Sequence, residues 1–376
     1  MRHFFIGGYM IRRTLIPLIV FVVLTVAASG QARVVDASDR LPVSAASIFD
    51  ASGNMVGFTA EDGTLSDIPQ SAYPITLRCM GYEQLTIEEP EDKTWEMVPV
   101  LYELDELVVV PVQRNVLKQT FYVREYFSIL ANNDTVAVFV ERMANRFVPL
   151  SKDAKFGGNS SLRILNSRMY ARYKLEGKDS VAADKDPQIP SMLSVFKPDD
   201  AQIVAPESFK EGSKAKIYEK RGKSGVSLLY RQNQQSFTVV EDVLAGKKGH
   251  SMSPWLLKLF GLSINVKQLY FTQAYRIKDD GIYLPEDLIE AGYVMETEGK
   301  GKSLRKIFGT QKPAVIRMMV ELYIAERDFL SADEAGEEYR NKSAKVEFII
   351  PDAVPPLTGA TKRLVQRATA EAVIQP

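Results

Sequence analysis

The stretch Gly53–Pro69, "GNMVGFTAEDGTLSDIP", places turn residues on both sides of a short run that favours a β-strand. Ser52–Asn54 and Glu61–Gly63 are typical turn sequences, because glycine adopts positive φ angles without steric strain. Between them, Met55–Ala60 is a candidate strand. A phosphate-binding loop would need a helix after its glycines, and an EF-hand loop would need alternating acids that end in a glutamate. Neither pattern is present, so the stretch predicts a domain of short strands joined by tight turns.

The same pattern of short strands and tight turns continues over residues 33–112. Apolar and polar residues alternate in Pro74–Leu77 and in Gln84–Ile87, which is the pattern of a half-buried strand. We expect about seven short strands in this region, which is typical of a small antiparallel sandwich.

The segment Val34–Glu88 also resembles a known family, the carboxypeptidase-regulatory-like domain of exported Bacteroidetes proteins. The residues that carry the resemblance are Gly57, Thr59, Asp62, Gly63, Gly81 and Tyr82. The resemblance covers residues 33–112 only. It implies a seven-stranded, prealbumin-like (Ig-like) sandwich with a structural or docking role, and it implies no peptidase activity.

The N-terminus has the layout of a secretory signal peptide. Arg12 and Arg13 precede the apolar run Leu15–Val26, and small residues follow. We expect a signal peptide over residues 1–32, cleaved after Ala32, with either Met1 or Met10 as the start. The apolar run is shorter than the ~20 residues of a membrane-spanning helix, which disfavours an anchor. The sequence therefore predicts export to the periplasm or the outer membrane of the cell envelope, with peripheral membrane association as one arrangement.

Residues 113–350 predict a second, larger β-rich domain. Apolar residues at every second position from Ile316 to Ile324 favour a strand, although the methionine and glutamate content makes helix a competing interpretation. We expect one curved antiparallel sheet or half-barrel with a few helices. Residues 179–192 are predicted to be loop, and residues 351–376 to be a C-terminal tail with a loosely held helix. Charges on both strand faces, taken over Tyr170–Glu176 and Lys216–Gly222, disfavour a membrane barrel, because they would put charge against lipid.

Candidate catalytic and metal-binding residues are scarce. The chain has two histidines, His3 and His250, and one cysteine, Cys79. A zinc peptidase site needs more imidazole than this, and no nucleophile elbow accompanies His250, which is predicted to lie in a solvated loop. Cys79 is predicted to be a small core residue. The sequence thus predicts no catalytic residue, no cofactor site and no metal site.

Adjacent acids are the remaining candidates for chemistry. Glu88-Glu89, Asp199-Asp200 and Asp279-Asp280 could serve a glycosidase, but acid pairs are also common in turns. Outside the three arginines of residues 1–32, the 44 basic and 47 acidic residues give a net charge of −3. This balance gives no reason to expect a nucleic-acid partner.

Three functional hypotheses follow. The first is a non-enzymatic exported protein of the cell envelope that binds or scaffolds an envelope or outer-membrane partner, such as a transport or surface complex. The second is a periplasmic hydrolase that uses carboxylates of the second region. The third is a small outer-membrane β-barrel.

Overall fold

We describe the fold from a computed structural model of the chain. It describes residues 32–65, 68–100, 114–159, 161–185, 187, 193, 198, 202–206, 217–221, 226–232, 236–244, 250–252, 262–309, 312–341 and 345–374. Residues 1–31 of the predicted signal peptide and residues 101–112, the end of the predicted first domain, lie outside these residues.

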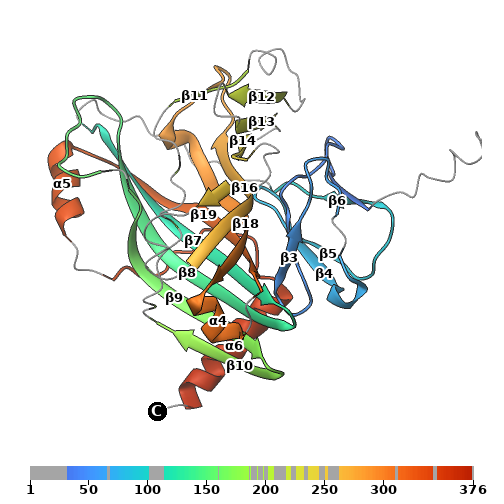
Figure 1. The fold of residues 1–376 in the computed structure, drawn as a ribbon. Coiled ribbons are helices and arrows are strands. Elements are labelled where there is room, and N and C mark those ends of the chain that lie inside the picture. The colour runs from blue at the N-terminus through green and yellow to red at the C-terminus, as the bar shows by residue number, and fades with distance from the viewer. Residues whose placement is uncertain are drawn as a thin grey trace, which may run out of the picture.

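The N-terminal unit consists of two small sheets (Figure 1). The four-stranded sheet has the antiparallel order β3-β2-β4-β5. The strands of that sheet are β2 (Ser47–Phe49), β3 (Met55–Phe58), β4 (Ile75–Arg78) and β5 (Leu85–Ile87). The second sheet pairs β1 (Arg33–Asp36) with β6 (Thr94–Met97) in parallel. Apolar side chains of both sheets form one core, which includes Val34, Ile48, Leu77 and Met97.

The turns around β3 form as the sequence predicts. The Asp50 carboxylate accepts hydrogen bonds from the backbone N–H groups of Ser52 and Asn54, at 2.9 and 2.8 Å, which closes the turn around Gly53. Gly53 has φ of +85° and Gly63 has φ of +78°, a conformation that side chains rarely tolerate. The opening stretch is therefore a β-turn, a strand and a second β-turn.

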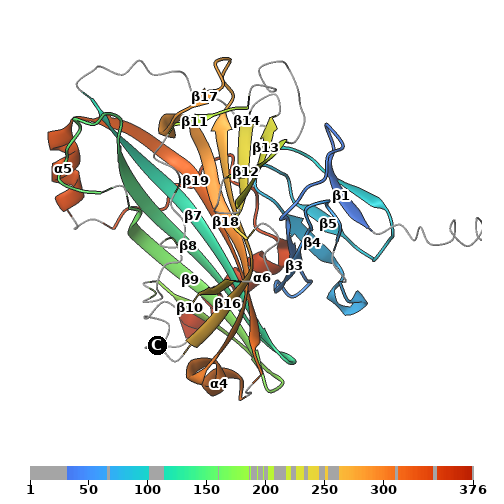
Figure 2. The ribbon, with the colours of Figure 1, turned by 45° about the horizontal axis from the view of Figure 1, so that its top comes forward.

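The larger unit is one sheet of eleven strands with the order β10-β9-β8-β7-β19-β18-β16-β14-β13-β12, and β15 pairs with β16. All of its described pairings are antiparallel. Its strands are β7 (Val116–Ala131), β8 (Asp134–Pro149), β9 (Arg163–Leu175), β10 (Lys178–Asp184), β12 (Ile217–Arg221), β13 (Val226–Gln232), β14 (Ser236–Asp242), β15 (His250–Met252), β16 (Leu262–Arg276), β18 (Leu288–Gly301) and β19 (Ala314–Leu330). Figure 2 shows how strongly the long strands twist and curve. A mainly β fold with a large antiparallel sheet is therefore confirmed.

The two faces of the large sheet have different coverings. One face, which we call the docking face, carries Tyr126, Phe139 and Glu321 and meets the N-terminal unit and the C-terminal residues. The opposite face carries Phe121 and Val320 within a large buried cluster. Short pieces cover its upper part, including β11 (Ile203–Val204), β17 (Ile282–Tyr283) and the 3-10 turn η4 (Pro285–Asp287).

Of the described helices, two lie at ends of the long strands and one packs partly on the docking face (Figure 1). They are α4 (Lys302–Phe308), α5 (Ala332–Arg340) and α6 (Gly359–Ile374), and a 3-10 turn η1 (Gln70–Ala72) lies in the N-terminal unit. α5 begins with a capping box in which Ser331 and Glu334 bond each other's backbone N–H groups. α6 packs against β9 and β10, with Ala368 fully buried.

Three local predictions differ from the structure. The β1–β6 pairing is parallel, although an all-antiparallel sandwich was expected. Residues 179–184, predicted to be loop, lie in the edge strand β10, because they continue the register from the tight turn at Glu176-Gly177. The terminal helix is present but is not loosely held, since the Arg363 guanidinium donates to the Ala51 carbonyl at 3.1 Å.

Among the described residues, helices long and apolar enough to cross a membrane are absent.

Gly63 provides a test of the turn chemistry. A Cβ at this position would lie 2.4 Å from the Val34 carbonyl oxygen, and the φ of +78° is strained for any other residue. We expect Gly63→Ala to lower the free energy of unfolding by about 1–3 kcal/mol from the backbone conformation alone, with the clash adding to this loss. Urea titration of residues 33–376 would measure it.

Gly57 is the matched control, because it lies in the same stretch without a positive φ. Its added Cβ would meet Ile48 and Ile68 at 3.8 Å, an ordinary contact. Gly57→Ala should change stability by less than about 0.5 kcal/mol. Equal effects of the two substitutions would contradict the turn assignment.

Candidate functional site

The N-terminal unit is fixed to the docking face by a buried ion pair. Arg78 lies at the end of β4, and its Nη2 donates to both carboxylate oxygens of Glu321 on β19, at 2.9 Å each. The two side chains are 3% and 2% exposed. Such a pair tolerates little displacement, because separating the charges would leave both desolvated without compensation.

Arg78 also contacts the C-terminal segment and an aromatic ring. Its Nη1 donates to the Pro356 carbonyl at 3.1 Å, and its guanidinium lies 5.3 Å from the ring centre of Tyr126. Burial acts to lower the pKa of Arg78, but the charge of Glu321, the neighbouring Tyr126 and Tyr323 and the hydrogen bond to Glu321 together raise it. Burial raises the pKa of the Tyr126 hydroxyl to about 12. Arg78 is therefore cationic and Tyr126 neutral at any physiological pH.

A second ion pair joins the two units at another point. Arg231 of β13 contacts the carboxylates of Asp36 and Asp39, and its Nη2 donates to Asp39 at 2.9 Å. Asp36 also accepts from the Tyr82 hydroxyl at 2.9 Å and from Ser38. Burial acts to raise the pKa of Asp36, but the Ser38 hydrogen bonds, Arg231 and Tyr82 together lower it. The site holds one positive and two negative charges.

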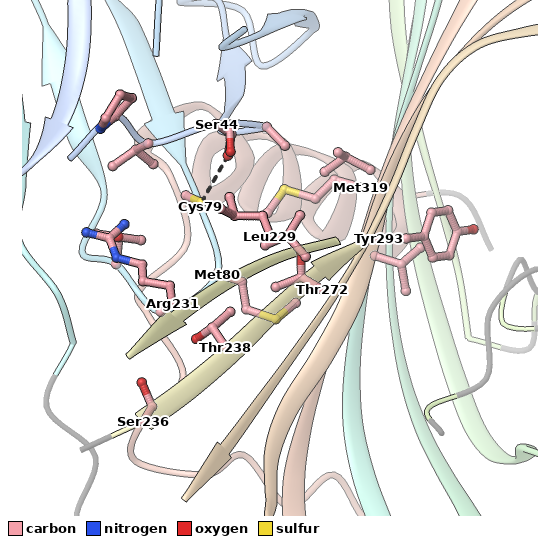
Figure 3. Close-up of a pocket in the computed structure, with 18 residues that line it drawn as sticks. Ser44, Cys79, Met80, Leu229, Arg231, Ser236, Thr238, Thr272, Tyr293 and Met319 are labelled. Atoms are coloured by element: carbon pink, nitrogen blue, oxygen red, sulfur yellow. Dashed lines mark hydrogen bonds between the residues drawn. The ribbon is translucent and has the colours of Figure 1, made fainter. Parts of the chain in front are cut away.

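A cavity of about 70 Å³ lies between the N-terminal unit and the docking face. Its roof comes from the segments Pro42–Ala45 and Cys79–Tyr82, and its floor comes from strands β13, β14, β16, β18 and β19. Figure 3 shows Met80 reaching down from the roof, with Arg231 at one end. The end of the Met80 side chain lies over Gly292 of β18, since a Cβ there would be 2.5 Å from the Met80 Cε. We call this the junction cavity, and it is the candidate functional site.

The floor of the junction cavity follows from strand alternation. Thr238 and Val240 of β14 point to the docking face because Phe237 and Val239 point to the opposite face. Thr272 of β16 lies across from Val240. Tyr293 contributes backbone only, since its ring lies on the far side of the sheet (Figure 3).

The C-terminal segment covers the rest of the docking face. The Asn166 amide donates to the Val346 carbonyl at 2.8 Å, and Arg124 donates to the Pro355 carbonyl at 2.5 Å. The guanidinium of Arg168 lies 4.3 Å from the ring centre of Phe348 and pairs with Glu141. Side chains of the sheet thus hold the backbone of residues 346–356.

The opposite face contains a second buried ion pair. Arg142 donates from Nε to Glu125 at 3.0 Å and from Nη1 to Ser167 at 2.7 Å, with both charged side chains at most 2% exposed. Nearby, Arg146 donates to Gln119 at 2.7 Å and to the Pro198 carbonyl at 2.7 Å. These contacts pair the buried charges of Arg142 and Glu125 within the sheet.

The candidate catalytic and metal-binding residues named from the sequence lie in different parts of the structure. Cys79 lines the junction cavity as a half-buried thiol, 4.0 Å from the Ser44 carbonyl. His250, predicted to be in a loop, lies instead in β15, where it pairs with Val266. Glu88-Glu89 and Asp279-Asp280 are exposed, and Asp199-Asp200 lies outside the described residues. No group of three histidine, cysteine or acidic residues able to hold a metal ion occurs in the part of the chain that the structure describes.

The residues that carry the family resemblance have structural roles. The Thr59 hydroxyl donates to the Val43 carbonyl at 2.7 Å and accepts from the Ala46 N–H at 2.9 Å. The Asp62 carboxylate accepts from the Thr64 N–H at 3.0 Å, which closes the turn that follows β3. The pattern therefore specifies turns and strand crossings.

Glu286, which the sequence analysis did not single out, has a carboxyl group with a raised pKa. Glu286 lies in η4, and burial raises the pKa of its carboxyl. Its neighbour Asp287 accepts from the Leu284 N–H at 2.9 Å and from Lys278 at 3.1 Å. The sequence Pro285-Glu286 is ordinary for a turn, so it gives no indication that the Glu286 carboxyl is buried.

Comparison with family models finds no match to this chain, and comparison with curated proteins finds none. The resemblance to the carboxypeptidase-regulatory-like domain therefore stays a prediction.

The buried pair Arg78–Glu321 can be tested by a double-mutant cycle. Each single substitution, Arg78→Met or Glu321→Leu, should lower the free energy of unfolding by about 3–5 kcal/mol, because each leaves one buried charge unpaired. The double variant should lose much less than the sum, since both charges are then absent. Urea titrations of the three variants would measure the coupling.

An exposed ion pair of the same unit is the control. Arg33 and Asp62 are 53% and 56% exposed at 3.2 Å. Arg33→Met should cost less than about 1 kcal/mol. Additive effects of the Arg78 and Glu321 substitutions would show that the two units are not joined through this contact.

Proposed function

We propose that this protein is a non-enzymatic, exported protein of the cell envelope that binds or scaffolds an envelope partner. The observation that carries the proposal is the fixed attachment of the N-terminal unit to the large sheet. Buried acids at the attachment are held by arginines, as in Glu321 with Arg78 and Asp36 with Arg231. Carboxylates neutralised in this way suit a rigid framework better than acid–base chemistry.

The geometry favours one strand edge for partner binding. The edge strand β3 lies against the large sheet, where the Met55 N–H donates to Ser128 at 2.7 Å and the Met55 carbonyl accepts from Arg317 at 3.3 Å. The other edge strand of that sheet, β5, pairs only with β4 among the described strands. An extended segment of a partner can add to such an edge through backbone hydrogen bonds. We therefore place the partner contact along Leu85–Ile87.

Site-specific photocrosslinking tests this proposal. A photoreactive residue at the exposed position Thr86, in protein exported to the envelope, should give one discrete adduct. The same residue at Lys178, on the edge strand β10 of the large sheet, is the matched control and should give none. Adducts at both positions, or at neither, would contradict partner binding at β5.

A carboxylate hydrolase is the second candidate, and one observation favours it. The buried Glu286 Oε2 has no hydrogen-bond partner within the described part of the chain, and a raised pKa is a property of general acids. If the protein acts by binding, Glu286→Gln leaves the photocrosslink from position 86 unchanged. Cells that carry this variant then have the same phenotype as cells that carry the unaltered protein. Loss of phenotype with the adduct retained would favour the hydrolase.

A further inference from the structure

The junction cavity combines an apolar wall with hydroxyl groups. Val43, Met80 and Met319 form part of the wall, together with Leu229 and Val240. Thr238 and Thr272 lie on adjacent strands at diagonal positions, since Thr238 pairs with Ala274 and Val240 pairs with Thr272. Diagonal neighbours lie about 7–8 Å apart at Cα, which is close enough for one small polar group to reach both side chains.

The hydroxyls of Thr238 and Thr272 can form hydrogen bonds with a bound ligand. Within the described residues, neither the Thr238 nor the Thr272 hydroxyl has a hydrogen-bond partner, and both line the cavity. A hydroxyl both donates and accepts, so the pair can bond an alcohol or an amide in either orientation.

The charge around the cavity disfavours ionic ligands. Arg231 is already shared between Asp36 and Asp39, so it gives no net positive potential for an anion. Asp36 and Asp39 together carry one more charge than Arg231, but both carboxylates already bond it. Asp36 also accepts from Tyr82 and Ser38, so a cation would have to break existing bonds to gain a counter-charge. Desolvation then penalises either kind of ion far more than a neutral molecule.

The size of the cavity limits the ligand. A volume of about 70 Å³ holds roughly five to seven water-sized groups at ~10–15 Å³ each. The thioethers of Met80 and Met319 can shift rotamer to accommodate a small ligand of irregular shape.

We propose that the junction cavity is a binding site for a small uncharged amphiphile, an alcohol or amide with a short apolar body. Its polar group bonds the hydroxyls of Thr238 and Thr272, and its apolar body lies against Val240 and the methionine side chains. This site is separate from the β5 edge and does not depend on the proposed partner.

A series of four-carbon probes tests the proposal on purified residues 33–376. Butyramide and 1-butanol should bind saturably with a Kd on the order of 1 mM in saturation-transfer NMR, as expected for a ligand of this size. Butyrate and butylammonium have the same chain with an ionic head and should bind at least 10-fold more weakly. Equal binding of all four probes, or binding of none at millimolar concentration, would overturn the proposal.

Substitutions locate the site. Thr238→Val and Thr272→Val keep the side-chain shape, and each should weaken butyramide binding about 5- to 10-fold. Val240→Phe should abolish binding by filling the cavity, and Thr272→Leu serves the same purpose if Val240→Phe does not fold. Thr94→Val, at an exposed position of β6, is the control and should leave the Kd unchanged. Binding that survives both threonine substitutions and the filled cavity would place the probe elsewhere and refute this site.

Discussion

The contact on which the arrangement depends is the buried pair between Arg78 and Glu321. A buried ion pair adds little net stability compared with an apolar contact of the same volume, but breaking one half of it is costly. Its consequence here is geometric: β4 of the N-terminal unit can meet β19 in only one position. Because Arg78 also bonds the Pro356 carbonyl, the same side chain orders the residues that lead into α6. One arginine thus fixes three parts of the chain that are far apart in sequence.

The charged residues of the central strands lie in environments that their sequence pattern does not indicate. Arg124 and Glu125 are adjacent on β7, and Glu141 and Arg142 are adjacent on β8, so each strand places charge on both faces. In the sequence, charge on both faces indicates a strand exposed to water. In the structure, Glu125 and Arg142 are buried against each other on one face, while Arg124 bonds the C-terminal segment on the other. Only the partner across the sheet distinguishes the two cases, and a single sequence does not identify it.

Local patterns predicted much of the fold, and long-range packing supplied the rest. The turns at Gly53 and Gly63 were predictable because glycine geometry is a local property, and the alternation in β19 was long enough to outweigh its helix-forming residues. The parallel pairing of β1 with β6 was not predictable, because it joins segments about sixty residues apart through backbone groups alone. The junction cavity was missed for the same reason: Cys79, Thr238 and Thr272 are ordinary core or strand residues until the two units meet.

The position of the cavity follows from the two ion pairs that join the units. Arg78–Glu321 lies beside one end of the cavity, next to Cys79 on the roof and Val320 on the floor, and Arg231 with Asp36 lies at the other end. Charged pairs fix the spacing of the two surfaces more strictly than apolar contacts, which can slide and repack. Between these two fixed points the floor presents the short side chains of Thr238 and Thr272. The space therefore remains as a consequence of rigid attachment, and any molecule that fills it contacts both units at once.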